Sequence, residues 1–197
     1  MYLKNIFKPI LLFIFLIIVI AFSLTLPNTG CAKAAVERPA TWATPITKKG
    51  LPNLFKVSDT LYRGAQPTQT GFLELKKMGV KTIVSLREHH TDKKLITGMG
   101  FTYFHIPTST TKPDRARYQK ALDIMNNPAM QPVFVHCQHG ADRTGTAVAL
   151  YRTTIQKWET EEAIRELQHG GYGHHTMFRD IIKFIRNFNK EPQPRKR

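Results

Sequence analysis

The sequence predicts an α/β fold, in which a single domain has a central, mostly parallel sheet flanked by helices on both faces. Strand-like and helix-like segments alternate through the middle of the chain, an order typical of parallel sheets. Residues 133–135 read as a buried strand that leads through a tight loop into a helix. The length of 197 residues suits one such domain with a short N-terminal appendage.

The elements of this domain are predicted in order from residue 54. Two short strands join at Ser58-Asp59, and Thr68 caps a helix that Gly79 ends. Further on, Thr160 is predicted to cap another helix. The predicted strands cover 54–57, 60–62, 80–86, 101–106 and 133–135. The predicted helices cover 69–78, 92–99, 114–126, the segment from the tight loop to about 158, 161–168 and 176–189.

The N-terminal segment has the pattern of a targeting sequence. Lys4 and Lys8 precede an uncharged run from residue 9 to residue 26, and Ala32-Lys33-Ala34 follows. This pattern predicts a secretory signal peptide over residues 1–34. The apolar run is also near the lower limit of a membrane-spanning helix, so an N-terminal membrane anchor is the alternative. In both cases we expect the domain to be exported to the periplasm or another extracytoplasmic space, either secreted or tethered by the uncleaved helix.

Composition divides the rest of the chain. Residues 35–53 are rich in Pro, Thr and Lys without periodicity, which predicts a linker or an arm lying on the domain. The domain itself is expected at 54–190, followed by a basic tail at 191–197. If the targeting segment is removed, Cys137 remains the sole thiol, because the other cysteine is Cys31. Lipidation of Cys31 is a minor alternative.

The net charge of +15 and the pI near 10.0 indicate attraction to acidic partners, or simply solubility. Phosphorylated protein, phosphoinositide and a membrane surface are all acidic. The basic residues are scattered along the chain, and no zinc-finger, RNA-binding or helix-turn-helix signature accompanies them. We therefore expect no nucleic acid partner, and contact with a membrane only through the N-terminal segment if it is uncleaved.

The functional prediction depends on the loop after residues 133–135. This loop contains Cys137, Gly140 and Arg143 and runs directly into a helix. A loop entering a helix N-terminus directs several free backbone N–H groups and the helix dipole to one point. Those groups and a nearby guanidinium stabilise a thiolate, and the planar guanidinium fits two phosphate oxygens. The pattern predicts in-line attack of Cys137 on phosphorus, with a phosphocysteine intermediate.

The same loop resembles the signature of a known family. His136-Cys137, followed after five residues by Arg143-Thr144-Gly145, resembles the cysteine-based protein tyrosine phosphatase superfamily in its dual-specificity-like branch. Four other stretches resemble the small exported bacterial members, at residues 60–67, 80–86, 149–152 and 170–173. The resemblance covers about residues 50–190 and implies a dual-specificity-phosphatase-like fold, with no cofactor and no metal.

The resemblance also assigns roles to residues of the loop. Cys137 is expected to be the nucleophile, His136 to orient the loop, and Thr144 to donate a hydroxyl hydrogen bond to the sulfur. Phosphate binding is expected from Gln138, His139, Gly140, Ala141, Asp142 and Arg143. The side chains of Gln138, His139, Ala141 and Asp142 are expected to point outward. On resemblance alone, Gln66, Gly170, Gly171 and Gly173 shape the pocket.

The general acid is the point at which the sequence departs from the family. The family's Asp would align near Thr110 or Thr111, and neither can protonate a leaving group. Asp114 is the candidate if its loop folds inward, although it is also a good helix N-cap. Asp142 is the alternative acid, because phosphatases resembling the myotubularins carry an Asp at this place. Asp92 follows a different strand and is the weaker candidate.

Three functions remain compatible with these residues. The first is a phosphatase acting on protein phosphotyrosine, with phosphoserine and phosphothreonine as further substrates. The second is a phosphoinositide or inositol phosphate phosphatase, and the third is a phosphate-binding pseudophosphatase. The pairs His89-His90 and His174-His175 read as surface or packing residues rather than metal ligands, because adjacent residues rarely share a face.

Overall fold

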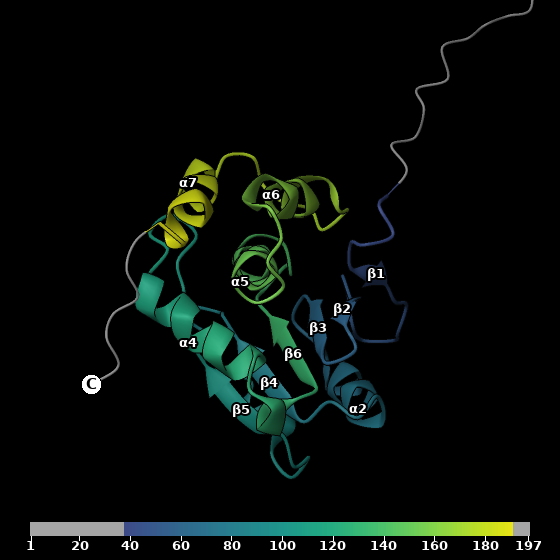
Figure 1. Cartoon of the computed structure of the whole chain (residues 1–197). Coiled ribbons are helices and arrows are strands. Elements are labelled where there is room, and N and C mark those ends of the chain that lie inside the picture. Colours follow the sequence, from purple (N-terminus) through teal and green to yellow (C-terminus); the bar gives the residue numbers. More distant parts are fainter. Residues whose placement is uncertain (1–37, 191–197) are drawn as a thin grey trace, which may run out of the picture. The chain divides into compact units, whose positions relative to one another are not determined.

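A six-stranded sheet organises residues 38–190, the part of the chain that this computed structural model describes (Figure 1). Its strand order is β1-β2-β3-β6-β4-β5, in which β3, β6, β4 and β5 run parallel and β1 and β2 are antiparallel. The strands are β1 (Thr44–Pro45), β2 (Phe55–Ser58), β3 (Leu61–Gly64), β4 (Thr82–Ser85), β5 (Thr102–His105) and β6 (Val133–His136). The predicted mostly parallel sheet is confirmed. The predicted targeting segment and basic tail lie outside the described residues.

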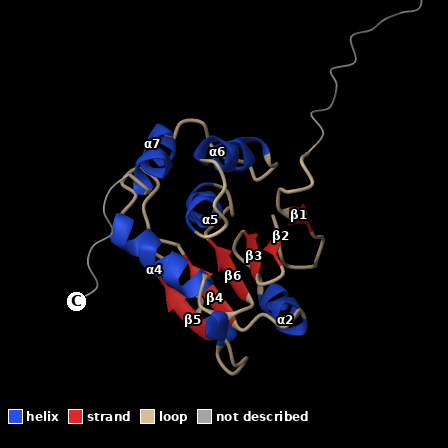
Figure 2. Cartoon of the chain, in the orientation of Figure 1, coloured by secondary structure: helices blue, strands red, loops and turns tan. Residues whose placement is uncertain are grey.

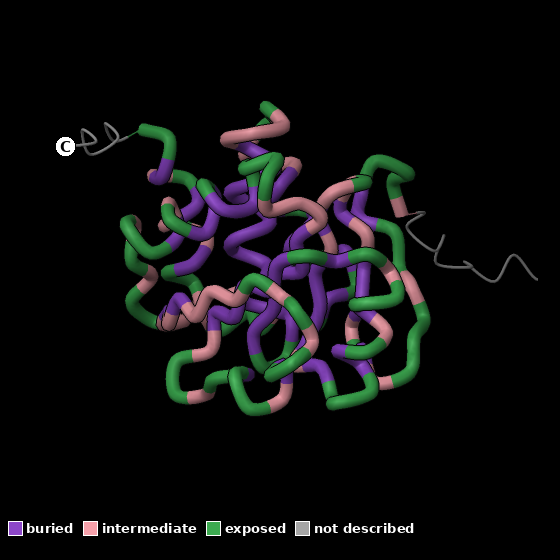
Figure 3. Tube along the Cα trace, turned by 90° about the horizontal axis from the view of Figure 1, so that it is seen from below, coloured by how far each residue is buried: buried purple, intermediate pink, exposed green. Residues whose placement is uncertain are grey.

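Helices cover both faces of this sheet (Figure 2). The helices are α2 (Gln69–Lys77), α3 (Lys93–Ile96), α4 (Arg115–Met125), α5 (Asp142–Thr154), α6 (Thr160–His169) and α7 (Arg179–Phe188), with a 3-10 turn η1 (Pro128–Met130). The larger core lies under α4, α5, α6 and α7, and the smaller core lies under α2 and α3. Figure 3 shows buried chain through the centre and exposed stretches along the outer loops.

The central strand β6 illustrates why both faces are covered. Val133 and Val135 belong to the larger core, whereas Phe134 between them belongs to the smaller core. Successive side chains of a strand point to opposite faces, so an all-apolar strand needs a cover on each side. All three side chains are fully buried, and burial of each contributes about 2 kcal/mol.

The parallel register brings three loops to one edge of the sheet. His136 at the end of β6 pairs with Gly64 on β3 and with Ser85 on β4. The chain leaves all three strands at this edge, where open α/β sheets bind their ligands. The loop from residue 137 to 141 therefore lies beside the segments that follow β3 and β4.

Several element boundaries differ from the prediction. The Thr68 side chain caps α2 as predicted, accepting from the Gly71 N–H at 3.2 Å. The helix after the loop ends at Thr154 rather than near 158, because Lys157 adopts a positive φ of 61°. Thr160 lies inside α6, which Glu159 precedes as the N-cap residue. The predicted helix at 92–99 is reduced to the four residues of α3.

Residues 38–53 lie on the domain as an arm, which is one of the two alternatives that the composition left open. Strand β1 pairs with β2, and Ala43 and Leu51 are almost fully buried. Arg38 stacks over the rings of Phe55 and Tyr172 and donates to the carbonyl of Gly170. This arm therefore contributes to the core next to the phosphate loop.

Candidate active site

The signature loop connects β6 to α5 at the carboxyl edge of the sheet. Cys137 follows the last residue of β6 and is only 2% exposed. Gly140 turns the chain with a positive φ of 71°, and a Cβ at this position would lie 2.6 Å from the Gly64 carbonyl carbon. Glycine is therefore required here for its backbone conformation and for the close approach of the β3 loop.

The carbonyls of the loop are held on its outer side. The Gln66 N–H donates to the Gln138 carbonyl at 3.1 Å, and Asn53 Nδ2 donates to the His139 carbonyl at 2.8 Å. Arg63 Nη2 donates to the Gly140 carbonyl at 2.5 Å. In a trans peptide the N–H points opposite to the C=O. The next three amides of the loop are therefore directed to its inner side.

Those inner amides form an anion cradle at the N-terminus of α5. Within residues 38–190, the backbone N–H groups of 138–142 donate to no other group of the chain. The dipole of the 13-residue helix α5 adds positive potential at the same point. The arrangement fits the oxygens of a phosphate.

Arg143 extends this cradle into an open pocket. The pocket has a volume of about 300 Å³, and its lining consists of Arg87, Glu88, His89, His90, Gln138 and Arg143. Arg143 Nε is buried and has no hydrogen-bond partner among the described residues, and the same holds for Thr144 Oγ1. The hydrogen bond that we expected from Thr144 to the sulfur is therefore not formed. The guanidinium remains available for an oxyanion.

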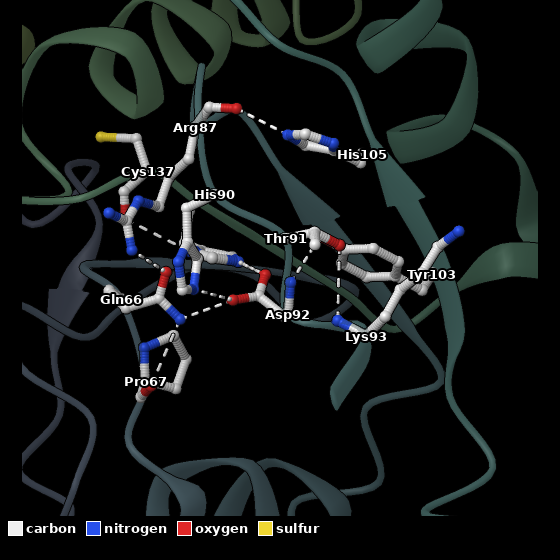
Figure 4. Close-up of polar contacts among 11 residues, drawn as sticks. Gln66, Pro67, Arg87, His90, Thr91, Asp92, Lys93, Tyr103, His105 and Cys137 are labelled. Carbon is white, nitrogen blue, oxygen red and sulfur yellow. Dashed lines mark hydrogen bonds and ion pairs between the residues drawn. The ribbon is translucent and has the colours of Figure 1, made fainter. Parts of the chain in front are cut away.

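A polar chain behind the loop begins at Arg87 and ends at the loop backbone (Figure 4). Arg87 Nη1 donates to Gln66 Oε1 at 3.0 Å, and Gln66 Nε2 donates to Asp92 Oδ1 at 2.6 Å. The ring of His136 continues this chain. Its Nε2 lies 3.0 Å from Asp92 Oδ2, and its Nδ1 lies 3.2 Å from the carbonyl oxygen of Cys137. Burial favours a higher pKa for Asp92, but the hydrogen bond and charge of His136 outweigh it and lower the pKa to about 2.

A second cation lies buried behind the loop. Arg63 is 1% exposed, and its guanidinium stacks 3.6 Å from the centre of the Tyr172 ring. Burial lowers the pKa of Arg63, and the nearby Tyr172, Glu166 and Cys137 act in the opposite direction. Tyr172 is fixed in turn by its hydroxyl, which donates to Glu166 at 3.0 Å. Arg63 therefore supports the loop and adds positive charge beneath it.

Asp142 does not point outward, as we expected, but is 6% exposed and held by two histidines. Its Oδ1 accepts from the His175 N–H at 3.0 Å, and its Oδ2 lies 2.7 Å from His175 Nδ1. His174 Nδ1 approaches Oδ1 at 2.9 Å without hydrogen-bond geometry. Burial acts to raise the pKa of Asp142, but these contacts lower it to about 2. His174 is packed, with a side chain 2% exposed, and His175 lies at the surface, as predicted, but their contact with Asp142 was not foreseen.

The other loop side chains follow the prediction in part. Gln138 and His139 are exposed, as expected, whereas Ala141 is buried because α5 begins immediately after it. Asp114 is exposed and accepts from the Arg117 N–H at 2.8 Å, so it acts as the N-cap of α4. In this arrangement its carboxylate serves its own helix rather than the loop.

Sequence reasoning assigned no loop-positioning role to four residues that have one, although it named Asp92 as a weaker candidate for the acid. Asn53, Arg63, Asp92 and Tyr172 reach the loop from other parts of the chain. The available signal was the parallel sheet, because Asp92 and Gln66 follow strands that flank β6. In the described part of the chain, no three His, Cys, Asp or Glu residues are arranged to hold a metal ion. None of its helices is long and apolar enough to span a membrane.

Comparisons with known proteins agree with this geometry. The family model described as DSP-PTPase phosphatase fused to NAD+ kinase matches residues 47–180. The dual specificity protein phosphatase TpbA of Pseudomonas aeruginosa is 33% identical over 167 residues, which cover 84% of this chain and 75% of TpbA. The inositol diphosphatase SIW14 of Saccharomyces cerevisiae is 30% identical over 124 residues, which cover 57% of this chain and 44% of SIW14.

A solved structure extends the similarity to the fold. The crystal structure of a P. aeruginosa TpbA variant in complex with phosphotyrosine has a TM-score of 0.69 and 30% identity, covering 78% of this chain and 94% of that chain. The family-model match over residues 47–180 includes strands β2 to β6, the loop and α5. The chain therefore belongs to the cysteine-based protein tyrosine phosphatase superfamily, in its dual-specificity-like branch.

Proposed function

We propose that the protein hydrolyses phosphomonoesters on protein substrates through a phosphocysteine intermediate on Cys137. The observation that carries this proposal is the loop itself, in which three carbonyls are tied outward, so that the amides that follow them are directed to the inner side of the loop. Such a cradle stabilises the charge that develops on the phosphoryl oxygens during transfer. Cys137 attacks phosphorus in line, Arg143 holds two oxygens, and water then releases phosphate.

Phosphotyrosine is the substrate that we favour, with phosphoserine and phosphothreonine as further substrates. TpbA, the relative with 33% identity, is a dual specificity protein phosphatase, and a TpbA structure contains phosphotyrosine. The open pocket of about 300 Å³ beside Arg143 offers space next to the cradle for a group attached to the phosphate.

A phosphoinositide or inositol phosphate is the second candidate. Arg87, His89 and His90 line the pocket together with Arg143, and the chain carries a net charge of +15. A substrate with several phosphates would gain from this lining. SIW14, a relative with 30% identity, is an inositol diphosphatase. Glu88 in the same lining and Asp142 within the loop oppose a polyanion.

We also propose that the domain is exported. The pattern of residues 1–34 supports this proposal, with its basic start, apolar run and Ala-Lys-Ala sequence. Expression of the full chain in a bacterial host, followed by fractionation, tests it. A product in the periplasmic fraction that begins at Ala35 indicates cleavage, whereas a full-length product in the membrane fraction indicates an anchor. Full-length protein in the soluble cytoplasmic fraction contradicts export.

The enzyme proposal is tested by assaying purified protein on p-nitrophenyl phosphate, a phosphotyrosine peptide and a phosphoinositide. We expect kcat/KM to be higher for the phosphotyrosine peptide than for the phosphoinositide. A preference for the phosphoinositide would favour the second candidate. Phosphate binding without turnover of any substrate would favour the pseudophosphatase and contradict the proposal.

A further inference from the structure

The phosphate loop alone does not explain which group gives a proton to the leaving group. Residues 107–113, where the family's acid would lie, contain no carboxylate. Asp114 caps α4 through the Arg117 N–H. Asp92 is fully buried and held by His136 and Gln66. Neither carboxylic acid is placed to give a proton to a substrate in the pocket.

The segment after α6 places an imidazole next to the loop. His175 contacts the Asp142 carboxylate twice. Its backbone N–H donates to Oδ1 at 3.0 Å, and its ring Nδ1 lies 2.7 Å from Oδ2. This double contact fixes both the position of the backbone and the orientation of the ring. Asp142 is the first residue of α5, so the ring is anchored to the same helix start that forms the cradle.

His175 combines this anchorage with access to solvent. Its side chain is 48% exposed, whereas the carboxyl group of Asp142 is 7% exposed. Its ring centre lies 6.1 Å from that of His139, an exposed residue of the phosphate loop. Because Nδ1 faces Asp142, the second ring nitrogen, Nε2, is the one that the Asp142 carboxylate leaves uncontacted.

We propose that His175, oriented by Asp142, gives a proton to the leaving-group oxygen and takes one back from the attacking water. This inference rests on the proposed phosphatase function and deepens it. A histidine oriented by a buried carboxylate is suited to proton transfer in both directions near neutral pH. The arrangement supplies the proton transfer that the missing loop carboxylate would otherwise provide.

His175 takes part in both steps of the reaction, the formation of phosphocysteine and its hydrolysis. In the first, the sulfur of Cys137 forms a bond to phosphorus while the bond from phosphorus to the leaving oxygen breaks, and that oxygen takes the proton from Nε2. In the second, a water oxygen bonds to phosphorus, the S–P bond breaks, and Cys137 leaves as the thiolate. The proton of that water returns to Nε2, which restores the starting form of His175.

The charged and titratable groups that face His175 come from three segments. Asp142 contacts it from the start of α5, His174 precedes it, and His139 faces it from the loop. Phe178, before α7, packs edge-on at 5.9 Å and is uncharged. Asp142 is therefore the charged group in the most direct contact with the ring of His175.

The test compares wild type with His175→Asn on two substrates that differ in leaving group. Phenyl phosphate releases an oxygen that needs a proton, whereas 2,4-dinitrophenyl phosphate releases one that is stable without it. We expect kcat/KM to fall about 100-fold for phenyl phosphate, the scale of a general acid, and less than about threefold for the other substrate. His169→Asn, at an exposed position in the last turn of α6, is the control and should leave both values unchanged.

Two further readouts separate proton transfer from a structural role. The variant should show a burst of dinitrophenol, because phosphocysteine forms quickly and then hydrolyses slowly without the histidine. For phenyl phosphate, kcat/KM of wild type should fall above the pH at which the proton donor is lost, and the variant should lack this limb. An equal loss on both substrates, or no loss on either, would overturn the inference and leave the phosphatase function intact. Wild type that turns over neither substrate would instead overturn the phosphatase function.

Discussion

Asp92 Oδ2 lies 3.0 Å from His136 Nε2, and neither side chain is exposed to solvent. The other ring nitrogen of His136 lies 3.2 Å from the carbonyl oxygen of Cys137. The ring therefore connects the start of the phosphate loop to the carboxylate that follows β4. This connection fixes the loop from behind and leaves its inner side open.

The first prediction concerns the pH dependence of stability. The pKa of Asp92 falls from 3.8 to about 2 in the folded protein. This shift is equivalent to about 2 kcal/mol, at about 1.4 kcal/mol per pKa unit. Because the folded pKa is the lower one, the stabilisation is complete above pH 3.8 and is lost as the pH falls through 2.

Asp92→Asn should therefore lower the free energy of unfolding by about 2 kcal/mol at neutral pH, and by much less near pH 2. Denaturant unfolding of wild type and variant over this range measures the difference. Asp123→Asn is the control, because Asp123 is exposed on α4 and accepts from Gln119 alone. A difference between wild type and Asp92→Asn that is independent of pH would contradict the assignment.

The second prediction separates chemistry from binding at the sulfur. Cys137→Ser should abolish turnover, because a hydroxyl lacks the nucleophilicity of a thiolate at neutral pH. The amides and Arg143 remain, so the variant should still bind phosphate with an affinity within about threefold of wild type. Calorimetric titration with inorganic phosphate measures this. Loss of phosphate binding in the folded variant would show that the loop is not the anion site.

The third prediction uses two glycines with the same backbone conformation. Gly140 and Gly79 have positive φ values of 71° and 79°, but a Cβ at Gly79 would meet nothing within 4 Å. A Cβ at Gly140 would lie 2.7 Å from the Ala65 nitrogen. Both alanine variants should lose about 1 kcal/mol of stability from the backbone strain.

The two variants should differ in activity. Gly140→Ala should lose activity by about tenfold or more, because displacement of the loop misplaces the amides. Gly79→Ala should retain the activity of wild type. Steady-state assays on p-nitrophenyl phosphate measure the activity of both variants. Equal activity would show that the close approach of the segment after β3 to Gly140 is unimportant for activity.

The fourth prediction contrasts two buried arginines. Arg63 donates to the Gly140 carbonyl and stacks on Tyr172, whereas Arg152 binds both oxygens of Glu166. Arg63→Met should weaken phosphate binding about tenfold, the scale of one charge-assisted hydrogen bond. Arg152→Met should destabilise the fold by about 3 kcal/mol, because it leaves Glu166 buried without its cation.

Calorimetric phosphate titration and thermal unfolding of both variants measure these effects. The expected result is a reversed order in the two assays, with Arg63→Met the weaker binder and Arg152→Met the less stable protein. If Arg63→Met binds phosphate as wild type does, the charge beneath the loop has no part in anion binding.

The sequence predicted the features that are local in the chain. Cys137, Gly140 and Arg143 lie within seven residues, so strand, loop and helix start could be read together. The supporting residues are not local, because Arg63 and Asp92 are 77 and 44 positions from their partners. Their contacts arise from the strand order, which places β6 between β3 and β4.

The prediction that the Asp142 side chain points outward failed for a different reason. An outward side chain was the simplest expectation at the start of a helix, but the His174-His175 segment lies against the N-terminus of α5 and covers the Asp142 carboxylate. Asp114, in contrast, was predicted as a possible cap from its position alone, and capping depends only on the next three residues.

Cys137 is the single cysteine of residues 38–190, and its thiol is free. This has a consequence for oxidative inactivation. Peroxide would convert the sulfur to a sulfenic acid, and a neighbouring thiol usually protects such a species by closing a disulfide. No such thiol exists in residues 38–190, so if the segment with Cys31 is removed, a small thiol or a reductase would have to reduce the oxidised sulfur.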